Sequence, residues 1–450
     1  MKKSTSPFQI VILVVMILGT VVGVLAFSGY LKLGKSSSST ASVTGSVSIW
    51  GTLPRSVMAE FINDQSTKNR DLKLSYTEVP EENFNQTVIE AIAAGKGPDV
   101  VIIDDSMLLQ YQNKAFVIPY TSYTEGQMKT NFIREAELLL TPNGILGFPV
   151  LVDPLVLYYN RDLFDKAGIA LPPKTWEEIK DRTPELAVVD KGNFTIKQSA
   201  IALGEYDNIP QAKQILLALF LQAGNTLTTM NQGMYMPTFV QDDPKKASLV
   251  SPLTFFTSFA SPTAPLYSWN KGLPNATQQF LLGKSAMYIG FASDLFELQK
   301  KNPNFNFDVV AFPQNAKATS AVTYGKLYSA VILKSSKNIP ASYVTAGLLS
   351  GNEAQQFLSS RLSLPPVRRE LLAVRPSQSY AQVFYNGALT ARSWLDPDAQ
   401  KSTPFFKQLI SAINSGRLSV DFALAELQAS LFPLYPQPEE LTTDMPTTGQ

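Results

Sequence analysis

Residues 144–179 read Gly-Ile-Leu-Gly-Phe-Pro-Val-Leu-Val-Asp-Pro-Leu-Val-Leu-Tyr-Tyr-Asn-Arg-Asp-Leu-Phe-Asp-Lys-Ala-Gly-Ile-Ala-Leu-Pro-Pro-Lys-Thr-Trp-Glu-Glu-Ile. The apolar and aromatic run at 155–159 predicts a buried strand. The polar pair Asp153-Pro154 interrupts two apolar runs that are both typical of strands. This interruption predicts that the chain leaves one packed unit at this point and enters another.

Two helix starts and stops follow this strand. Residues 163–167 can close about one helical turn, and Gly168 is placed to end it. Thr175, with Glu178 three residues later, predicts the capped start of a second helix. A strand followed closely by helices is typical of an α/β protein.

Three parts of this stretch resemble one protein family in order and spacing. They are Phe148-Pro149, the run Leu-Tyr-Tyr-Asn-Arg-Asp at 157–162, and Lys-Thr-Trp-Glu-Glu-Ile at 174–179. Together they are similar to the first domain crossing of family 1 extracellular solute-binding proteins of ABC importers, the maltose-binding-protein-like group. The alternative is an ordinary strand–helix unit of an unrelated α/β domain.

Further segments extend the resemblance to about residues 47–430, although it is weak at 191–269. Gly-Lys-Gly-Pro-Asp-Val-Val at 95–101 and Gly-Lys-Ser-Ala-Met-Tyr-Ile-Gly at 283–290 are similar to two family segments. The resemblance implies a periplasmic-binding-protein-like α/β fold, with two α/β lobes, a hinge, interleaved chain crossings and a ligand cleft between the lobes. An N-terminal transmembrane helix is expected to precede it.

The resemblance and the composition together predict the following domain organisation. The expected segments are a membrane anchor or signal (1–30), a Ser-rich linker (31–46), lobe 1 (47–152 and 288–333), lobe 2 (157–287 and 334–433) and a disordered tail (434–450).

The N-terminal segment is apolar from residue 10 to 27 and follows Lys2 and Lys3. Its length is at the lower edge of a bilayer span, and the preceding charges favour a cytoplasmic N-terminus. A cleaved signal ending at Ala26 is the alternative. We expect an uncleaved single-pass anchor in the cell membrane, with the soluble domain on the extracellular side.

The composition excludes several kinds of chemistry. The 450 residues include no Cys and no His, which removes thiol catalysis, disulfides and the commonest general base. The formal net charge of +1 gives no indication of nucleic acid binding. We therefore expect no enzyme activity, no cofactor, no metal and no nucleic acid partner.

The candidate ligand-binding residues come from distant segments that the resemblance places at the cleft. Aromatic faces stack on sugar rings, and carboxylates accept hydrogen bonds from sugar hydroxyls. The candidates are Trp50, Asp104, Asp153, Phe291, Asp294, Tyr324 and Trp394.

Three acidic residues among or beside these candidates have structural alternatives. Asp104 and Asp105 follow an apolar strand, and either could cap the helix expected at Ser106, with capping favoured for Asp105. Asp153 either faces ligand or accepts hydrogen bonds from the backbone of the hinge.

The function that the resemblance implies is capture of a small polar solute by hinge closure. The solute is expected to be a carbohydrate, and the protein a monomer that delivers it to ABC permease subunits. The alternative is a surface-anchored sensing or adhesion protein on the same fold, without transport.

Overall fold

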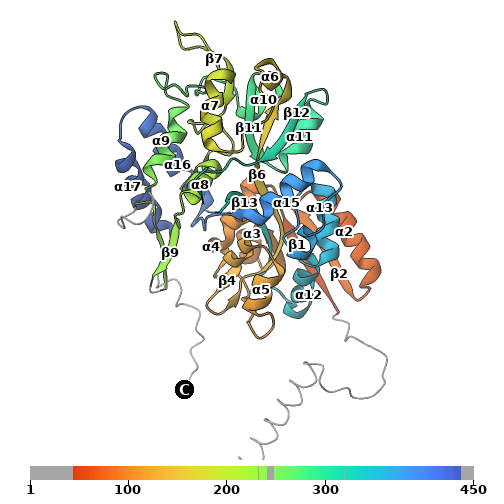
Figure 1. Ribbon diagram of the computed structural model, residues 1–450. Helices are drawn as coiled ribbons and strands as arrows, with labels where there is room; N and C mark the ends of the chain where they lie inside the picture. Colours follow the sequence, from red (N-terminus) through yellow and green to blue (C-terminus); the bar gives the residue numbers. More distant parts are fainter. Residues whose placement is uncertain (1–43, 232, 241–247, 319, 437–450) are drawn as a thin grey trace, which may run out of the picture. The chain divides into compact units, whose positions relative to one another are not determined.

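The structure is a computed structural model that describes residues 44–231, 233–240, 248–318 and 320–436 (Figure 1). The apolar run at 10–27, most of the linker and residues 437–450 lie outside the described residues. Within the described ranges, no helix is long and apolar enough to cross a bilayer. Tyr435 was expected in the disordered tail, but it is buried and its ring stacks on Tyr235, so that expectation is wrong for this residue.

The strands form one ten-stranded sheet and two short two-stranded sheets in the described part of the chain. The large sheet contains β1 (Gly45–Gly51), β2 (Leu72–Glu78), β3 (Val100–Ile103), β6 (Phe148–Asn160), β7 (Val188–Val189), β8 (Ile196–Ile201), β11 (Ser285–Phe291), β12 (Phe307–Ala311), β13 (Thr323–Ile332) and β14 (Ala391–Arg392). Its order is β2-β1-β3-β13-β6-β11-β8-β7, with β12 paired to β6 and β14 paired to β13. The small sheets pair β4 (Leu140–Thr141) with β5 (Gly144–Ile145) and β9 (Thr228–Asn231) with β10 (Met234–Pro237).

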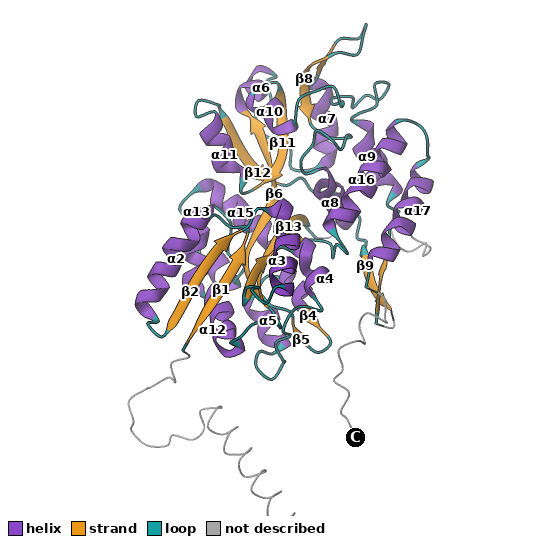
Figure 2. Ribbon diagram, turned by 180° about the vertical axis from the view of Figure 1, so that it is seen from behind, coloured by secondary structure: helices purple, strands orange, loops and turns teal. Residues whose placement is uncertain are grey.

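Strand β6 links the two halves of the large sheet (Figure 2). Its first part, to Pro154, pairs antiparallel with β13, and its second part, from Leu155, pairs antiparallel with β11 and β12. One strand runs through both apolar segments, so Asp153-Pro154 does not break the strand, but its pairing partners change at this point, where the sequence predicted a passage from one packed unit to another. The Pro154 carbonyl accepts from the Ala292 amide at 2.9 Å, which ties this point of β6 to the segment after β11.

Helices pack on both halves of this sheet. Helix α2 packs against β2, α12 against β1 and β13, α7 against β8, and α15 against β6 and β12. The α-helices are α2 (Arg55–Lys68), α3 (Phe84–Ala93), α4 (Leu108–Tyr111), α5 (Glu125–Asn131), α6 (Arg161–Lys166), α7 (Trp176–Leu186), α8 (Ala212–Gln222), α9 (Val250–Ser258), α10 (Ala276–Leu281), α11 (Asp294–Lys301), α12 (Ile339–Leu349), α13 (Asn352–Leu362), α14 (Arg369–Leu372), α15 (Ser379–Thr390), α16 (Ala399–Asn414) and α17 (Val420–Leu431). The 3₁₀ turns in the described ranges are η1 (Glu81–Asn83), η2 (Asp105–Met107), η3 (Arg134–Leu139) and η4 (Phe432–Leu434).

The local signals after the crossing strand are confirmed. Helix α6 is followed by Gly168 with φ of +70°, a left-handed conformation that glycine adopts without strain. The Thr175 side chain accepts from the Glu178 amide at 3.1 Å and caps α7. Short-range spacing thus determines where these two helices end and begin.

Strand pairing bears on the expected lobe boundaries, which remain a prediction. The boundary at residue 288 would divide β11, but β11 is one buried strand that pairs with the second part of β6. Beyond residue 334, helix α12 packs on β1 and β13, because its buried face includes Ala346 and Leu349. Pairing therefore groups β11 and β12 with the second part of β6, and α12 with the first part.

Candidate functional site

Asp104 and Asp105 follow β3 at its carboxyl end, where open α/β sheets bind their ligands. Asp104 Oδ1 accepts from the Ser106 amide at 3.0 Å and caps the turn η2. Asp105 instead accepts from the Tyr324 hydroxyl at 2.9 Å and from the Leu327 amide at 3.0 Å. The favoured prediction that Asp105 is the cap is therefore wrong, because its carboxyl turns inward to β13.

Lys326 on β13 lies among several of these acidic side chains. It is the cross-strand partner of Asp153. Its ammonium Nζ is 3.9 Å from Asp104 Oδ2 and 3.3 Å from Glu81 Oε1. The same Nζ lies 5.4 Å from the centre of the Phe291 ring, and the side chain is only 20% exposed. We call Lys326 with Asp104, Asp153 and Phe291 the lysine cluster.

Asp153 is 2% exposed and lies in the middle of β6. Its Oδ1 accepts from the Ser293 amide at 3.1 Å, just after β11. This bond is the backbone role that the sequence left open, and it fixes Asp153 between β6 and the segment after β11. Burial raises the pKa of the Asp153 carboxyl to about 7.

Phe291 and Tyr324 meet edge to face, with ring centres 6.5 Å apart. Asp294 lies nearby, and its Oδ2 accepts from the Tyr288 hydroxyl at 2.7 Å and from the Phe291 amide at 3.2 Å. These bonds occupy one Asp294 oxygen with contacts inside the protein. Ligand contact by Asp294 and Tyr324 stays a prediction.

A further acidic residue, Glu135, is buried near Asp105. It lies on η3, and the Ser393 hydroxyl donates to its carboxyl at 2.5 Å. Burial raises the pKa of Glu135 to about 8, and burial with the nearby Asp104 charge raises the pKa of Asp105 to about 7. Among the described residues, no group of three or more acidic side chains is arranged to hold a metal ion.

The profile of the family described as bacterial extracellular solute-binding protein matches residues 50–359, more than half of this chain. The chain belongs to this family.

Two kinds of relative agree with this membership. A Brucella abortus (strain 2308) protein, named only as a binding protein, is 23% identical over 341 residues, covering 74% of this chain and 76% of that one. The sugar-binding protein MalE from Xanthomonas citri matches with a TM-score of 0.70 and 20% identity, over 87% of this chain and 97% of that one. The cyclic alpha-maltosyl-1,6-maltose binding protein from Arthrobacter globiformis matches with a TM-score of 0.70 and 16% identity, over 87% of this chain and 99% of that one. The α/β, periplasmic-binding-protein-like fold is thereby confirmed.

The two tryptophan candidates of this solute-binding protein lie in different surroundings. Trp50 is half-buried on β1, where it pairs in register with Thr77 and Val101. Trp394 is buried, its Nε1 donates to Thr228 Oγ1 at 2.8 Å, and its ring packs edge to face on Phe239 and at a steep angle to Phe406. The contacts described for Trp394 do not include the lysine cluster, so its ligand contact stays a prediction.

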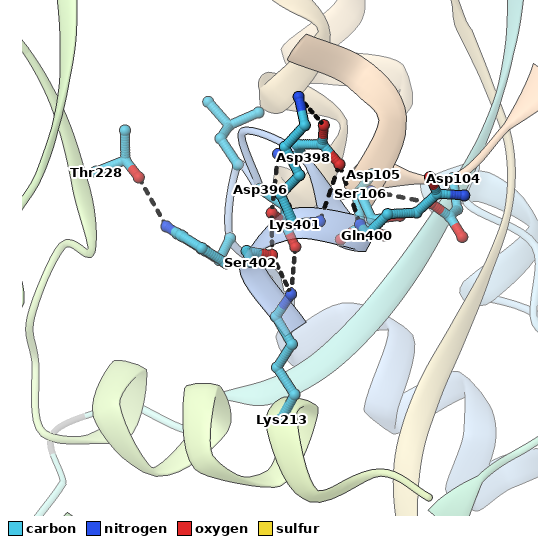
Figure 3. A network of polar contacts seen from close by, with 12 residues as sticks. Asp104, Asp105, Ser106, Lys213, Thr228, Asp396, Asp398, Gln400, Lys401 and Ser402 are labelled. Carbon is cyan, nitrogen blue, oxygen red and sulfur yellow. Dashed lines mark hydrogen bonds and ion pairs between the residues drawn. The ribbon is translucent and has the colours of Figure 1, made fainter. Parts of the chain in front are cut away.

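The residue that sequence reasoning missed is Lys326. Its signal was present, because it is the one charged residue in the otherwise uncharged strand β13. A second missed group joins Lys213 on α8 to Asp396 and Ser402 (Figure 3). Lys213 Nζ also lies 5.4 Å from the centre of the Trp394 ring.

The buried carboxyls predict that this solute-binding protein becomes more stable as the pH falls from about 8 to about 5. Their folded pKa values of about 7 to 8 exceed the unfolded values of about 4, so the folded state binds more protons in this window. The added stability is complete below about pH 4 and is lost as the pH rises through 7 to 8. We expect a change of at least about 1 kcal/mol, measured by urea unfolding at several pH values.

Glu135→Gln should reduce this pH dependence, because the amide does not titrate. The matched control is Glu137→Gln, two residues away and only half-buried, which should leave the slope unchanged. Equal slopes for the wild type and Glu135→Gln would show that Glu135 does not titrate in this range.

Proposed function

We propose that this protein captures a carbohydrate at the lysine cluster and passes it to the permease subunits of an ABC importer. The observation that supports the proposal most is the convergence of Asp104, Asp153 and Phe291 on Lys326, beside the strand β6 that both halves of the sheet share. The carboxylates can accept hydrogen bonds from sugar hydroxyls, and the ammonium can donate to them. The Phe291 ring offers an apolar face to the C–H side of a sugar ring.

Hinge closure is the proposed mechanism, with no covalent chemistry. Three segments connect the two groups of elements: strand β6, strand β13 and the turn at Ser293 that follows β11. Asp153 lies on β6 and Lys326 on β13. A solute held between them would favour the closed arrangement to the extent that it binds that arrangement more tightly. The sugar-binding proteins named above share the fold, which supports a carbohydrate as the solute class.

Membrane tethering completes the proposal. The segment 10–27 would hold the domain at the outer face of the membrane, with the Ser-rich segment as a flexible spacer. This arrangement keeps a monomeric binding domain close to its permease. Mass analysis of membrane-extracted protein tests the tether, because a mature N-terminus at Phe27 would contradict it.

A thermal-shift screen of the full-length protein in detergent tests solute binding. The panel contains mono- and oligosaccharides, with amino acids and polyamines as the contrasting classes. A sugar at 100 times its dissociation constant should stabilise the fold by about 2.7 kcal/mol, which raises the melting temperature by about 3 °C. A shift with amino acids or polyamines but with no sugar would contradict the carbohydrate assignment.

Asp153→Ala should weaken binding of that sugar by about 1.5–3 kcal/mol, because it removes a charged acceptor beside Lys326. Calorimetry at pH 8 measures this with most of the Asp153 carboxyl ionised. The control is Asp71→Ala, an exposed carboxylate whose loss should leave affinity unchanged. Unchanged affinity with a large drop in melting temperature would make Asp153 purely structural, acting through its bond to Ser293.

A further inference from the structure

A cavity of about 350 Å³ lies away from the lysine cluster and shares no lining residue with it. Its wall is built from four separate segments: the turn η3, residues 221–228 from the end of α8 to the start of β9, Val322 just before β13, and residues 392–395 at and after β14. The residues used below are Arg134, Thr226, Thr228, Arg392 and Trp394. A cavity of this size is large enough for a small metabolite.

Two arginines are the charged residues in this wall. Arg134 is exposed on η3, and Arg392 is half-buried on β14. Within the described ranges, no ion pair is formed by either guanidinium. The one hydrogen bond described for the Arg392 guanidinium goes to the neighbouring carbonyl of Ala391. Burial lowers the pKa of the Arg392 guanidinium; the Glu135 carboxyl opposes this shift, and the nearby Arg134 charge adds to it.

The nearest carboxyl on η3 does not neutralise this pair. Glu135 bonds to Ser393, and its pKa of about 8 keeps much of it protonated at neutral pH. Two planar guanidiniums whose donors remain available match the paired oxygens of a carboxylate or a phosphate. Thr226 and Thr228 add hydroxyl groups to the same wall, and Trp394 adds an apolar surface.

We propose that this cavity is a second ligand site, which binds a small anion with a carboxylate or phosphate group through Arg134 and Arg392. The site is independent of the carbohydrate proposal, because its lining and its charge both differ from those of the lysine cluster. A neutral carbohydrate has no charge to pair with two arginines, so this cavity suits a different class of ligand from the one proposed for the lysine cluster.

Calorimetric titration of the full-length protein in detergent tests this site. The probes are inorganic phosphate and citrate, each titrated separately in a buffer of low ionic strength that contains neither. We expect saturable binding of at least one probe, and the stronger one identifies the anion class. Arg134→Gln and Arg392→Gln should each weaken it about tenfold or more, because each removes charge-assisted hydrogen bonds.

Arg375→Gln is the matched control, since Arg375 is exposed and does not line the cavity. It removes the same charge and should leave the affinity unchanged. Arg134 is exposed, so its variant should fold and decides the matter even if Arg392→Gln unfolds. The proposal is overturned if neither anion binds saturably, or if Arg375→Gln weakens binding as much as the cavity variants do.

Discussion

Lys213→Met is expected to lower the free energy of unfolding by about 3–5 kcal/mol. The Lys213 and Asp396 side chains are only 8% and 5% exposed, and they meet at 2.5 Å (Figure 3). Removing the ammonium leaves Asp396 buried with the Ser402 hydroxyl but without a counter-charge. Urea unfolding of the two proteins measures the difference.

The double variant Lys213→Met with Asp396→Leu should recover most of this loss, because no buried charge then remains unpaired. Lys407→Met is the surface control, since its pair with Asp207 is more than half exposed and should contribute less than about 1 kcal/mol. If Lys213→Met costs no more than Lys407→Met, the buried pair does not stabilise the fold more than a surface pair does.

Trp269→Ala is expected to cost about 3–5 kcal/mol, because the ring is fully buried and its removal leaves a cavity. The indole Nε1 also donates to Asn208 Oδ1 at 2.9 Å, and the Asn208 amide in turn bonds the carbonyls of Asn270 and Leu273. The loss should therefore exceed that expected from packing alone.

Trp269→Phe separates the two contributions in the same unfolding measurement. It keeps most of the buried ring but removes the donor, so it should cost clearly less than Trp269→Ala. Equal costs for both variants would show that the hydrogen bond, rather than the packing, dominates at this position.

The parts of the fold that sequence predicts are those determined by short-range spacing. Thr175 and Gly168 mark helix ends because capping depends on residues three or four apart. The buried strand at 155–159 follows from its continuous apolar run. The family resemblance extends these local signals to the whole architecture.

The candidate site was less accessible to sequence reasoning because its contacts join distant segments. The Tyr324 hydroxyl reaches Asp105, 219 residues earlier, and no local pattern encodes that pairing. Local rules also suggested the wrong cap, because Asp104 and Asp105 are adjacent at the start of the same turn and spacing alone does not distinguish them. Strand register, which brings Lys326 opposite Asp153, decides the site and is visible only in the folded sheet.

The most direct test of the central claim is a crystal structure of this protein with the sugar that the thermal-shift screen selects. The account predicts sugar hydroxyls within hydrogen-bond distance of Lys326 Nζ and of the Asp104 or Asp153 carboxylates, with a sugar ring against Phe291. A sugar bound elsewhere, for example against Trp394 in the arginine-lined cavity, with the lysine cluster unoccupied, would contradict it.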